Sequence, residues 1–168
     1  MATNFLLKLD GAGIKGESSV DGYTDHMELQ SLKFGGTQTG TFGTTGGGGG
    51  GKFTPHDLEI TMWTNKATPK MIEACANGSH IKTATLVCRK AGGKAAVDYL
   101  KVTLSDVVIS HHTTEFQPDP DSKNEHTIDT FKLNYSKIGV EYKEQKPDGS
   151  AGASVEGGWD LAKLKAGK

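Results

Sequence analysis

Residues 26–35, HMELQSLKFG, indicate how the sheet bends, because their apolar side chains change phase halfway along the stretch. The two apolar pairs are Met27 with Leu29, and Leu32 with Phe34. Successive side chains of a strand point to opposite faces, so a regular strand would send the two pairs to opposite sides. A β-bulge near Gln30 and Ser31 bends the strand and lets both pairs face one core. The stretch therefore predicts a second strand that bends at its middle.

Two longer stretches repeat this change of phase. The strand expected over AAVDYLKVTL (95–104) continues as SDVVISHHTTE (105–115) after a change at Ser105. The stretch TIDTFKLNYSKIGVEYKEQ (127–145) is predicted to be one long strand, in which the apolar parity switches after Tyr135. Strands that bend sharply let a sheet curl until it closes on itself. The three changes of phase therefore favour a barrel over a flat sheet.

The predicted fold class is mostly β (α+β), a compact antiparallel β-barrel formed as a single domain by residues 1–168. One short flanking helix is expected at about residues 69–77, followed by Gly78 as its left-handed end. Thr68 is expected to cap this helix, and Pro69 suits its first position. The expected apolar stripe of the helix consists of Met71, Ile72 and Cys75.

The remaining elements follow from alternation and turn residues. A long hairpin is expected between residues 80 and 104, with Gly92 and Gly93 at its tip. The stretch KPDGSAGASVEGG (146–158) is expected to be a turn region. Short strands are expected at residues 4–10, 57–64 and 159–165.

Composition and charge exclude several classes of protein. The 168 residues carry a formal net charge of -1, so no broad basic field attracts nucleic acid or anionic lipid. No apolar stretch approaches the roughly 18 residues of a membrane span, so no membrane insertion is expected. Asp10 interrupts the first apolar run, which is predicted to be a strand and not a signal peptide. Cys75 and Cys88 have no CxxC partner and are expected to be free thiols.

The glycine tract GTTGGGGGGKF (43–53) has the outline of a phosphate-binding loop, but the chemistry around it does not fit. Phe53 follows Lys52, where such a loop needs a hydroxyl group to hold magnesium. A phosphate cradle also needs a helix N-terminus, whereas residues 53–63 alternate as a strand does. We therefore expect no bound nucleotide.

Metal and catalytic motifs are also missing from the sequence. His111 and His112 are adjacent, so on a strand they face opposite sides, one exposed and one at a barrel rim. The stretch DPDSKNEHTIDT (119–130) begins like a calcium loop but lacks its central glycine and closing glutamate. No G-x-S-x-G or HExxH motif is present. The sequence therefore predicts a protein that assembles or binds, with no enzymatic activity, no metal and no cofactor.

An ordered series of short motifs resembles one family along essentially the whole chain. The series is KGES (15–18), HMELQSLKFG (26–35), ATPKMIEACANGSH (67–80), CRKAGG (88–93), YLKVTLSDVVIS (99–110), LNYSKIGVEY (133–142) and GGWD (157–160). In this order they resemble Hcp, the haemolysin-coregulated protein of bacterial type VI secretion systems. The long glycine tract is an extreme version of a loop that varies in this family.

The resemblance implies a β-barrel that associates with itself into a homohexameric ring around a wide channel. Such rings stack into a tube, carry a spike protein at the tip and are propelled out of the cell by a contractile sheath. The channel receives small effector proteins. The resemblance further implies residence in the bacterial cytoplasm before firing, followed by secretion without a cleaved signal peptide.

Two groups of site residues follow from the resemblance. The long loop is expected to contact neighbouring subunits or rings through Phe42, Thr44, Gly46, Gly47, Gly48, Gly49, Gly50, Gly51, Lys52 and Phe53. Fixing six glycines opposes folding by about 6–12 kcal/mol of backbone entropy, so we expect the loop to order only against another copy. Ser31 and Lys33 are expected to point out of the barrel and contact cargo in the channel.

A second reading remains open from the sequence alone. A stand-alone β-barrel module that binds a ligand or peptide would be a monomer with a concave aromatic patch. Trp63 and Trp159 are far apart in the sequence, and nothing in it groups them.

Overall fold

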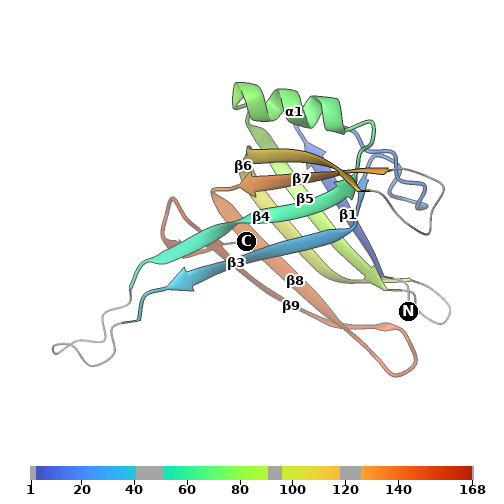
Figure 1. Cartoon of the computed structure of the whole chain (residues 1–168). Coiled ribbons are helices and arrows are strands. Elements are labelled where there is room, and N and C mark those ends of the chain that lie inside the picture. The colour runs from blue at the N-terminus through green and yellow to red at the C-terminus, as the bar shows by residue number, and fades with distance from the viewer. Residues whose placement is uncertain (1–2, 41–50, 91–95, 118–125, 168) are drawn as a thin grey trace.

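The computed structural model of the chain describes residues 3–40, 51–90, 96–117 and 126–167. Its elements are β1 (Thr3–Asp10), β2 (Met27–Leu29), β3 (Ser31–Gln38), β4 (Phe53–Trp63), α1 (Thr68–Asn77), β5 (Ile81–Lys90), β6 (Val97–Gln117), β7 (His126–Asn134), β8 (Lys137–Gln145), β9 (Ala151–Asp160) and β10 (Lys165–Ala166). The strand pairs in these residues are antiparallel. Figure 1 shows the barrel that they form, with α1 outside it. The predicted mostly β fold with one short helix is confirmed.

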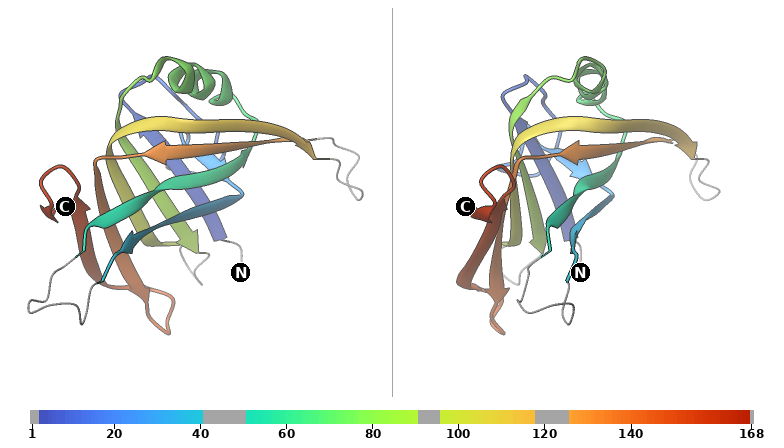
Figure 2. Two further views of the ribbon diagram at one scale, coloured as in Figure 1. Left: turned by 60° about the vertical axis from the view of Figure 1, so that its left-hand side comes forward. Right: turned by 90° about the vertical axis from the view of Figure 1, so that its left-hand side faces the viewer.

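The barrel closes because the chain passes from one sheet to the other within β6 and again between β2 and β3. The first half of β6 pairs with β5 and β8, whereas its second half pairs with β7. On the far side β2 pairs with β1, and β3, which follows it directly, pairs with β4. Since β4 also pairs with β7, the strands return to β6 and complete the circuit. Figure 2 shows β6 curving from one sheet into the other.

The corner in residues 26–35 has the predicted effect on the core. Met27 and Leu29 are buried, and Leu32 and Phe34 are half-buried against the same core. The irregularity at Gln30 is a break between β2 and β3, and the Gln30 N–H donates to the carbonyl oxygen of Thr61 at 2.8 Å. The chain thus turns from one sheet to the next at this residue.

The bend of β6 lies where the sequence predicts it. Leu104 and Val107 are both buried although their spacing would place them on opposite faces of a regular strand. Between them Asp106 has a φ of 50°, a left-handed conformation that shifts the alternation by one residue. β6 nevertheless continues through this bend without a break.

The single strand predicted over residues 127–145 is wrong, because the chain divides there into β7 and β8. The two strands pair with different halves of β6 and so follow its bend. At the break the Ser136 N–H donates to the carbonyl oxygen of Ser105 at 3.0 Å. The change of parity after Tyr135 marks a change of sheet.

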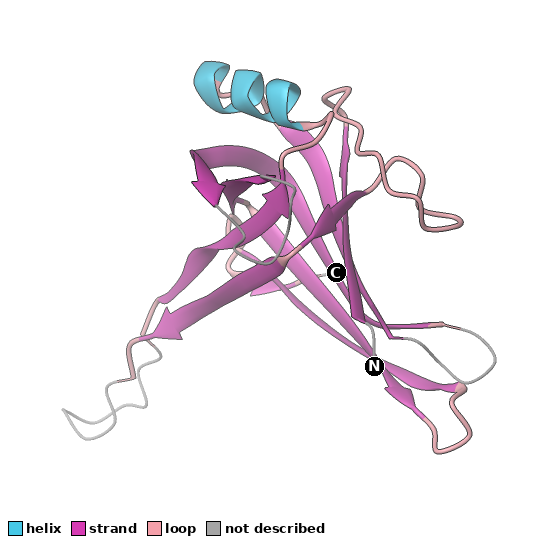
Figure 3. Ribbon diagram, turned by 45° about the vertical axis from the view of Figure 1, so that its right-hand side comes forward, coloured by secondary structure: helices cyan, strands magenta, loops and turns pink. Residues whose placement is uncertain are grey.

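Helix α1 lies across one end of the barrel (Figure 3) and buries Met71 and Ala74 in the core. It ends as predicted, at Gly78 in a left-handed conformation with φ 66°. The expected cap by Thr68 is wrong, because no side chain caps the helix and the Thr68 hydroxyl donates to Asp129 at 2.6 Å. The expected stripe is wrong at Ile72, which is exposed because it lies a quarter turn away from Met71.

The turn region predicted at 146–158 is also wrong in extent. The turn is confined to the residues between β8 and β9, and β9 pairs along nearly the whole of β8. A Cβ at Gly158 would overlap the carbonyl oxygen of Gly167, so glycine lets the end of the chain pass close to β9. The last strand predicted at 159–165 is reduced to the two-residue β10 beside the end of β9. The predicted hairpin tip at Gly92 and Gly93 lies outside the described residues.

Candidate functional site

The outer face of the sheet formed by β3, β4, β7 and the second half of β6 is polar. Cross-strand register places its residues in rows, since paired residues share a face. One row carries hydroxyl groups on Ser31, Thr61, Thr130 and Thr113. The next row carries Lys33, Glu59, Lys132 and His111. These two rows define the polar face.

Contacts between strands hold the polar face in place. Ser31 and Thr61 share a hydrogen bond of 2.6 Å between their hydroxyl groups. The Lys132 ammonium lies 3.4 Å from the Glu59 carboxylate. At one end, the Asp57 carboxylate accepts hydrogen bonds from the side chains of Ser110 and Asn134. The surface is polar and cross-linked between strands, which suits transient contact with a polar partner more than tight capture of an apolar ligand.

The structure places the predicted cargo residues on this face. Ser31 and Lys33 are both exposed, as expected if Leu32 and Phe34 turn toward the core. Their outward direction is therefore confirmed, and their contact with cargo stays a prediction. His111 is exposed on the same face, whereas His112 packs against Phe131 with ring centroids 4.8 Å apart. The two histidines thus face opposite sides, as predicted.

The predicted contact loop is described only at its C-terminal end. Phe42, Thr44 and Gly46–Gly50 lie outside the described residues. The Phe53 ring lies against Gly36 of β3, so this aromatic side chain anchors the start of β4. β4 begins at Phe53, directly after Lys52, and offers no helix N-terminus to a phosphate group. The role of the loop in assembly stays a prediction.

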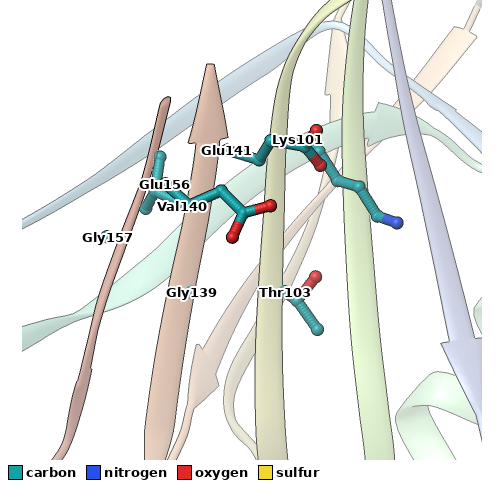
Figure 4. Close-up of a pocket in the computed structure, with 7 residues that line it drawn as sticks. All are labelled: Lys101, Thr103, Gly139, Val140, Glu141, Glu156 and Gly157. Carbon is teal, nitrogen blue, oxygen red and sulfur yellow. The ribbon is translucent and has the colours of Figure 1, made fainter. Parts of the chain in front are cut away.

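The opposite outer face carries a shallow hollow of about 250 Å³ over β6, β8 and β9 (Figure 4). Gly139 and Gly157 leave the floor of the hollow open, and Glu141 and Glu156 lie side by side across two strands. The hydroxyl of Ser154 and the ammonium of Lys143 lower the pKa of Glu141 below its usual value. A carboxyl group held ionised in this way is unsuited to be a general acid. The described residues that line this hollow carry no aromatic side chain.

Metal and redox chemistry find no support in the described ranges. No three His, Cys, Asp or Glu side chains converge on a common point in the residues that the structure describes. Cys75 and Cys88 are free, and burial raises the pKa of the Cys88 thiol, which disfavours the reactive thiolate. No helix among these residues has the length and apolar character needed to cross a bilayer.

Sequence reasoning missed a second surface, which lies on the hairpin formed by β8 and β9. This hairpin, here called the arm, extends one sheet beyond the barrel (Figure 1). Leu100, Tyr142 and Val155 form one row across β6, β8 and β9 on the side that faces the core. Their exposure rises outward, from half-buried Leu100 to 48% for Tyr142 and 69% for Val155. Only the parity of Tyr142 hinted at this surface, because the residues around Val155 have the composition of a loop.

Comparison with known proteins gives consistent matches. The family model described as "Type VI secretion system effector, Hcp" matches residues 6–142. Protein hcp1 of Pseudomonas aeruginosa is 36% identical over 111 residues, a match that spans 66% of each chain and thus slightly less than two thirds of that relative.

Solved structures resemble the whole fold. Hcp1 from Salmonella typhimurium superposes with a TM-score of 0.77 at 27% identity, covering 99% of both chains. A structure described as a type six secretion system protein gives a TM-score of 0.86 at 23% identity, covering 99% of this chain and 100% of its own, which speaks for the fold alone. The chain therefore belongs to the Hcp family of type VI secretion systems, a family of structural tube proteins without enzymatic activity.

Proposed function

We propose that this chain forms a homohexameric ring through the arm, and that the polar face lines the channel of the ring. The observation that carries the proposal is the row Leu100, Tyr142 and Val155, which becomes more exposed with distance from the barrel. An apolar sheet face that leaves its own core is stabilised when another surface covers it. Because the arm leaves the barrel on one side only, it meets a different surface of the next copy, and such head-to-tail contacts close into rings.

Stacked rings would form a tube, with a spike protein at its tip and a contractile sheath around it. Effector proteins would travel in the channel, against the polar face. The near-neutral net charge of -1 keeps repulsion between copies small. We place the chain in the bacterial cytoplasm before firing and outside the cell afterwards. Family membership supports these partners in general and identifies none of them individually.

Light scattering on the purified chain tests the ring. A mass near six times 17.8 kDa is expected for the unmodified chain. Val155→Glu places a charge in the exposed row and is expected to yield single chains. Leu164→Glu is the matched control, because Leu164 is 63% exposed on a turn outside this row. A six-chain mass for Val155→Glu, or a single-chain mass for the unmodified protein, would contradict the proposal.

Cargo retention tests the channel. Lys33→Glu reverses the charge on the polar face and is expected to reduce co-purification of effector proteins with intact rings. Lys101→Glu, in the hollow on the opposite outer face, is the matched control. Equal cargo retention by both variants would mean that the polar face does not bind cargo.

The predicted contact loop requires a separate measurement, because it concerns ring against ring. Hydrogen exchange of residues 40–53 is expected to slow when rings stack into tubes, since the prediction is that the glycines gain order only against another copy. Equal exchange in single rings and tubes would exclude the stacking role.

A further inference from the structure

One end of the polar face carries a large exposed aromatic side chain. Trp63, at the end of β4, is 39% exposed and pairs with Ile128 of β7. The His126 ring packs against the indole with centroids 4.9 Å apart. The Thr64 N–H donates to the carbonyl oxygen of Thr127 at 3.0 Å, which fixes the end of β4 against β7. The indole is therefore held in place with part of its surface open to a partner.

A carboxylate without a partner among the described residues lies in the same row. Ile128 pairs with Glu115 of β6, so Trp63, Ile128 and Glu115 share one face across three strands. Neighbouring strands are about 5 Å apart, which places Glu115 about 10 Å from Trp63. We call Trp63, His126, Ile128 and Glu115 the tryptophan patch.

Glu115 differs from the two other carboxylates of this sheet face. Asp57 accepts hydrogen bonds from Ser110 and Asn134, and Glu59 lies 3.4 Å from the Lys132 ammonium. Glu115 is exposed and forms no hydrogen bond or ion pair with the residues in the described parts of the chain. The patch thus combines an open aromatic surface with a carboxylate that no described residue pairs with.

We propose that the tryptophan patch binds an arginine side chain of a protein carried in the channel. An arginine side chain can lie over Ile128, between Trp63 and Glu115. From there its guanidinium group can stack on the indole and pair with the carboxylate. Lysine fits less well, because its ammonium is compact and does not stack on the ring. The inference rests on the proposed function for the location of the patch in the channel, and the binding chemistry itself does not depend on the ring.

Tryptophan fluorescence can report this contact directly. The chain has two tryptophans, and Trp159→Phe leaves Trp63 as the sole reporter. The Trp159 indole nitrogen is buried without a hydrogen-bond partner among the described residues, so its replacement by phenylalanine leaves no partner unpaired. The probe is a blocked pentapeptide with two arginines flanking a leucine. Its addition to Trp159→Phe protein is expected to change the Trp63 emission saturably, and the lysine version is expected to bind more weakly.

A matched pair of charge variants tests the role of Glu115. In the Trp159→Phe protein, Glu115→Gln is expected to weaken binding of the arginine peptide by about threefold to tenfold. Glu73→Gln removes the same charge from α1, outside the polar face and the patch, and is expected to change binding by less than about twofold, because Lys70 already pairs with Glu73. An unchanged affinity in Glu115→Gln, or an emission that never responds to the arginine peptide, would overturn the proposal.

The experiment separates this inference from the proposed ring. Light scattering on the same samples reports whether the chain is hexameric, and the peptide titration reports whether the patch binds arginine. A single-chain mass with saturable, Glu115-dependent binding would contradict the ring and support the patch. A six-chain mass without binding would support the ring and contradict the patch.

Discussion

Strands β7 and β8 both pair with β6, yet their surroundings differ sharply. β7 lies between β6 and β4 and buries Phe131 and Leu133 completely. β8 lies between β6 and β9, and Tyr142 on its core-facing side remains 48% exposed. Apolar alternation marks both strands in the sequence, so alternation alone does not determine burial. Burial depends on whether another layer faces the strand, and for the outer part of the arm the proposed layer is a second copy.

The largest expected effect comes from a substitution in β7, whose core-facing side chains are completely buried. Phe131→Ala opens a cavity in the core and is expected to lower the free energy of unfolding by about 3–5 kcal/mol. Urea unfolding measures this loss, with Tyr142→Glu added to every variant so that subunit unfolding is separated from ring dissociation. Phe116→Ala is the control of the same residue type, because Phe116 is largely exposed on β6. A similar loss of stability in both variants would mean that the buried Phe131 stabilises the fold no more than the exposed Phe116 does.

A second variant tests the polar contact that joins α1 to β7 and β6. The fully buried Asp129 carboxylate accepts hydrogen bonds of 2.6 Å from Thr68 of α1 and from Thr114 of β6. Asp129→Asn replaces one acceptor by a donor and is expected to lower the free energy of unfolding by about 1–3 kcal/mol. Glu59→Gln, which alters an exposed ion pair, is expected to change it by less than about 1 kcal/mol. Equal effects in urea unfolding would mean that Asp129 does not tie the helix to the sheet.

The sequence predicted the bends better than the ends of the strands. Each change of parity, at Gln30, at Ser105 and after Tyr135, coincides with a corner of the barrel, because apolar residues must face the core on both sides of a bend. β9 escaped prediction because its glycines and alanines carry no apolar alternation, and its pairing with β8 supplies the order that its composition lacks. Thr68 has the side chain of a cap, but its hydroxyl donates a hydrogen bond to the distant Asp129.

For the candidate surfaces too, the sequence predicts what depends on neighbouring residues and misses what depends on pairing between strands. The outward direction of Ser31 and Lys33 follows from the parity of their neighbours and could be predicted. The rows that they share with Thr61 and Glu59 depend on register between strands, which no local pattern specifies. The exposed row on the arm likewise appears only when Tyr142 and Val155, which are distant in sequence, are paired.

A smaller effect on stability is expected at high pH, and it comes from the buried Tyr135 between β7 and β8. Burial, and then the nearby Asp57 charge, raise the pKa of Tyr135, whose hydroxyl donates to the His56 carbonyl oxygen at 3.2 Å. A folded-state pKa above the unfolded value means that the folded chain holds this proton more tightly. The stabilisation is then complete below about pH 10 and is lost as the pH rises through the folded pKa.

Tyr135→Phe removes both the hydrogen bond and this titration. At neutral pH the variant is expected to be less stable than the unmodified chain by about 1 kcal/mol. The difference is expected to narrow above about pH 10, because only the unmodified chain loses stability through Tyr135. Urea unfolding at a series of pH values measures it, and comparing differences cancels the titration of the other tyrosines. A difference that widens with pH would contradict the raised pKa.

The smallest expected effect on stability comes from a substitution at the exposed Val155 of β9. Val155 is 69% exposed in a single chain, so Val155→Ser in the Tyr142→Glu background is expected to change the free energy of unfolding by less than about 0.5 kcal/mol. The same substitution in the unmodified chain is expected to weaken assembly, because there Val155 is covered by the neighbouring copy in the proposed ring. Urea unfolding gives the first quantity and light scattering across a dilution series gives the second. A large loss of stability in the single chain would mean that the arm packs onto its own barrel, and the exposed row would then need no partner.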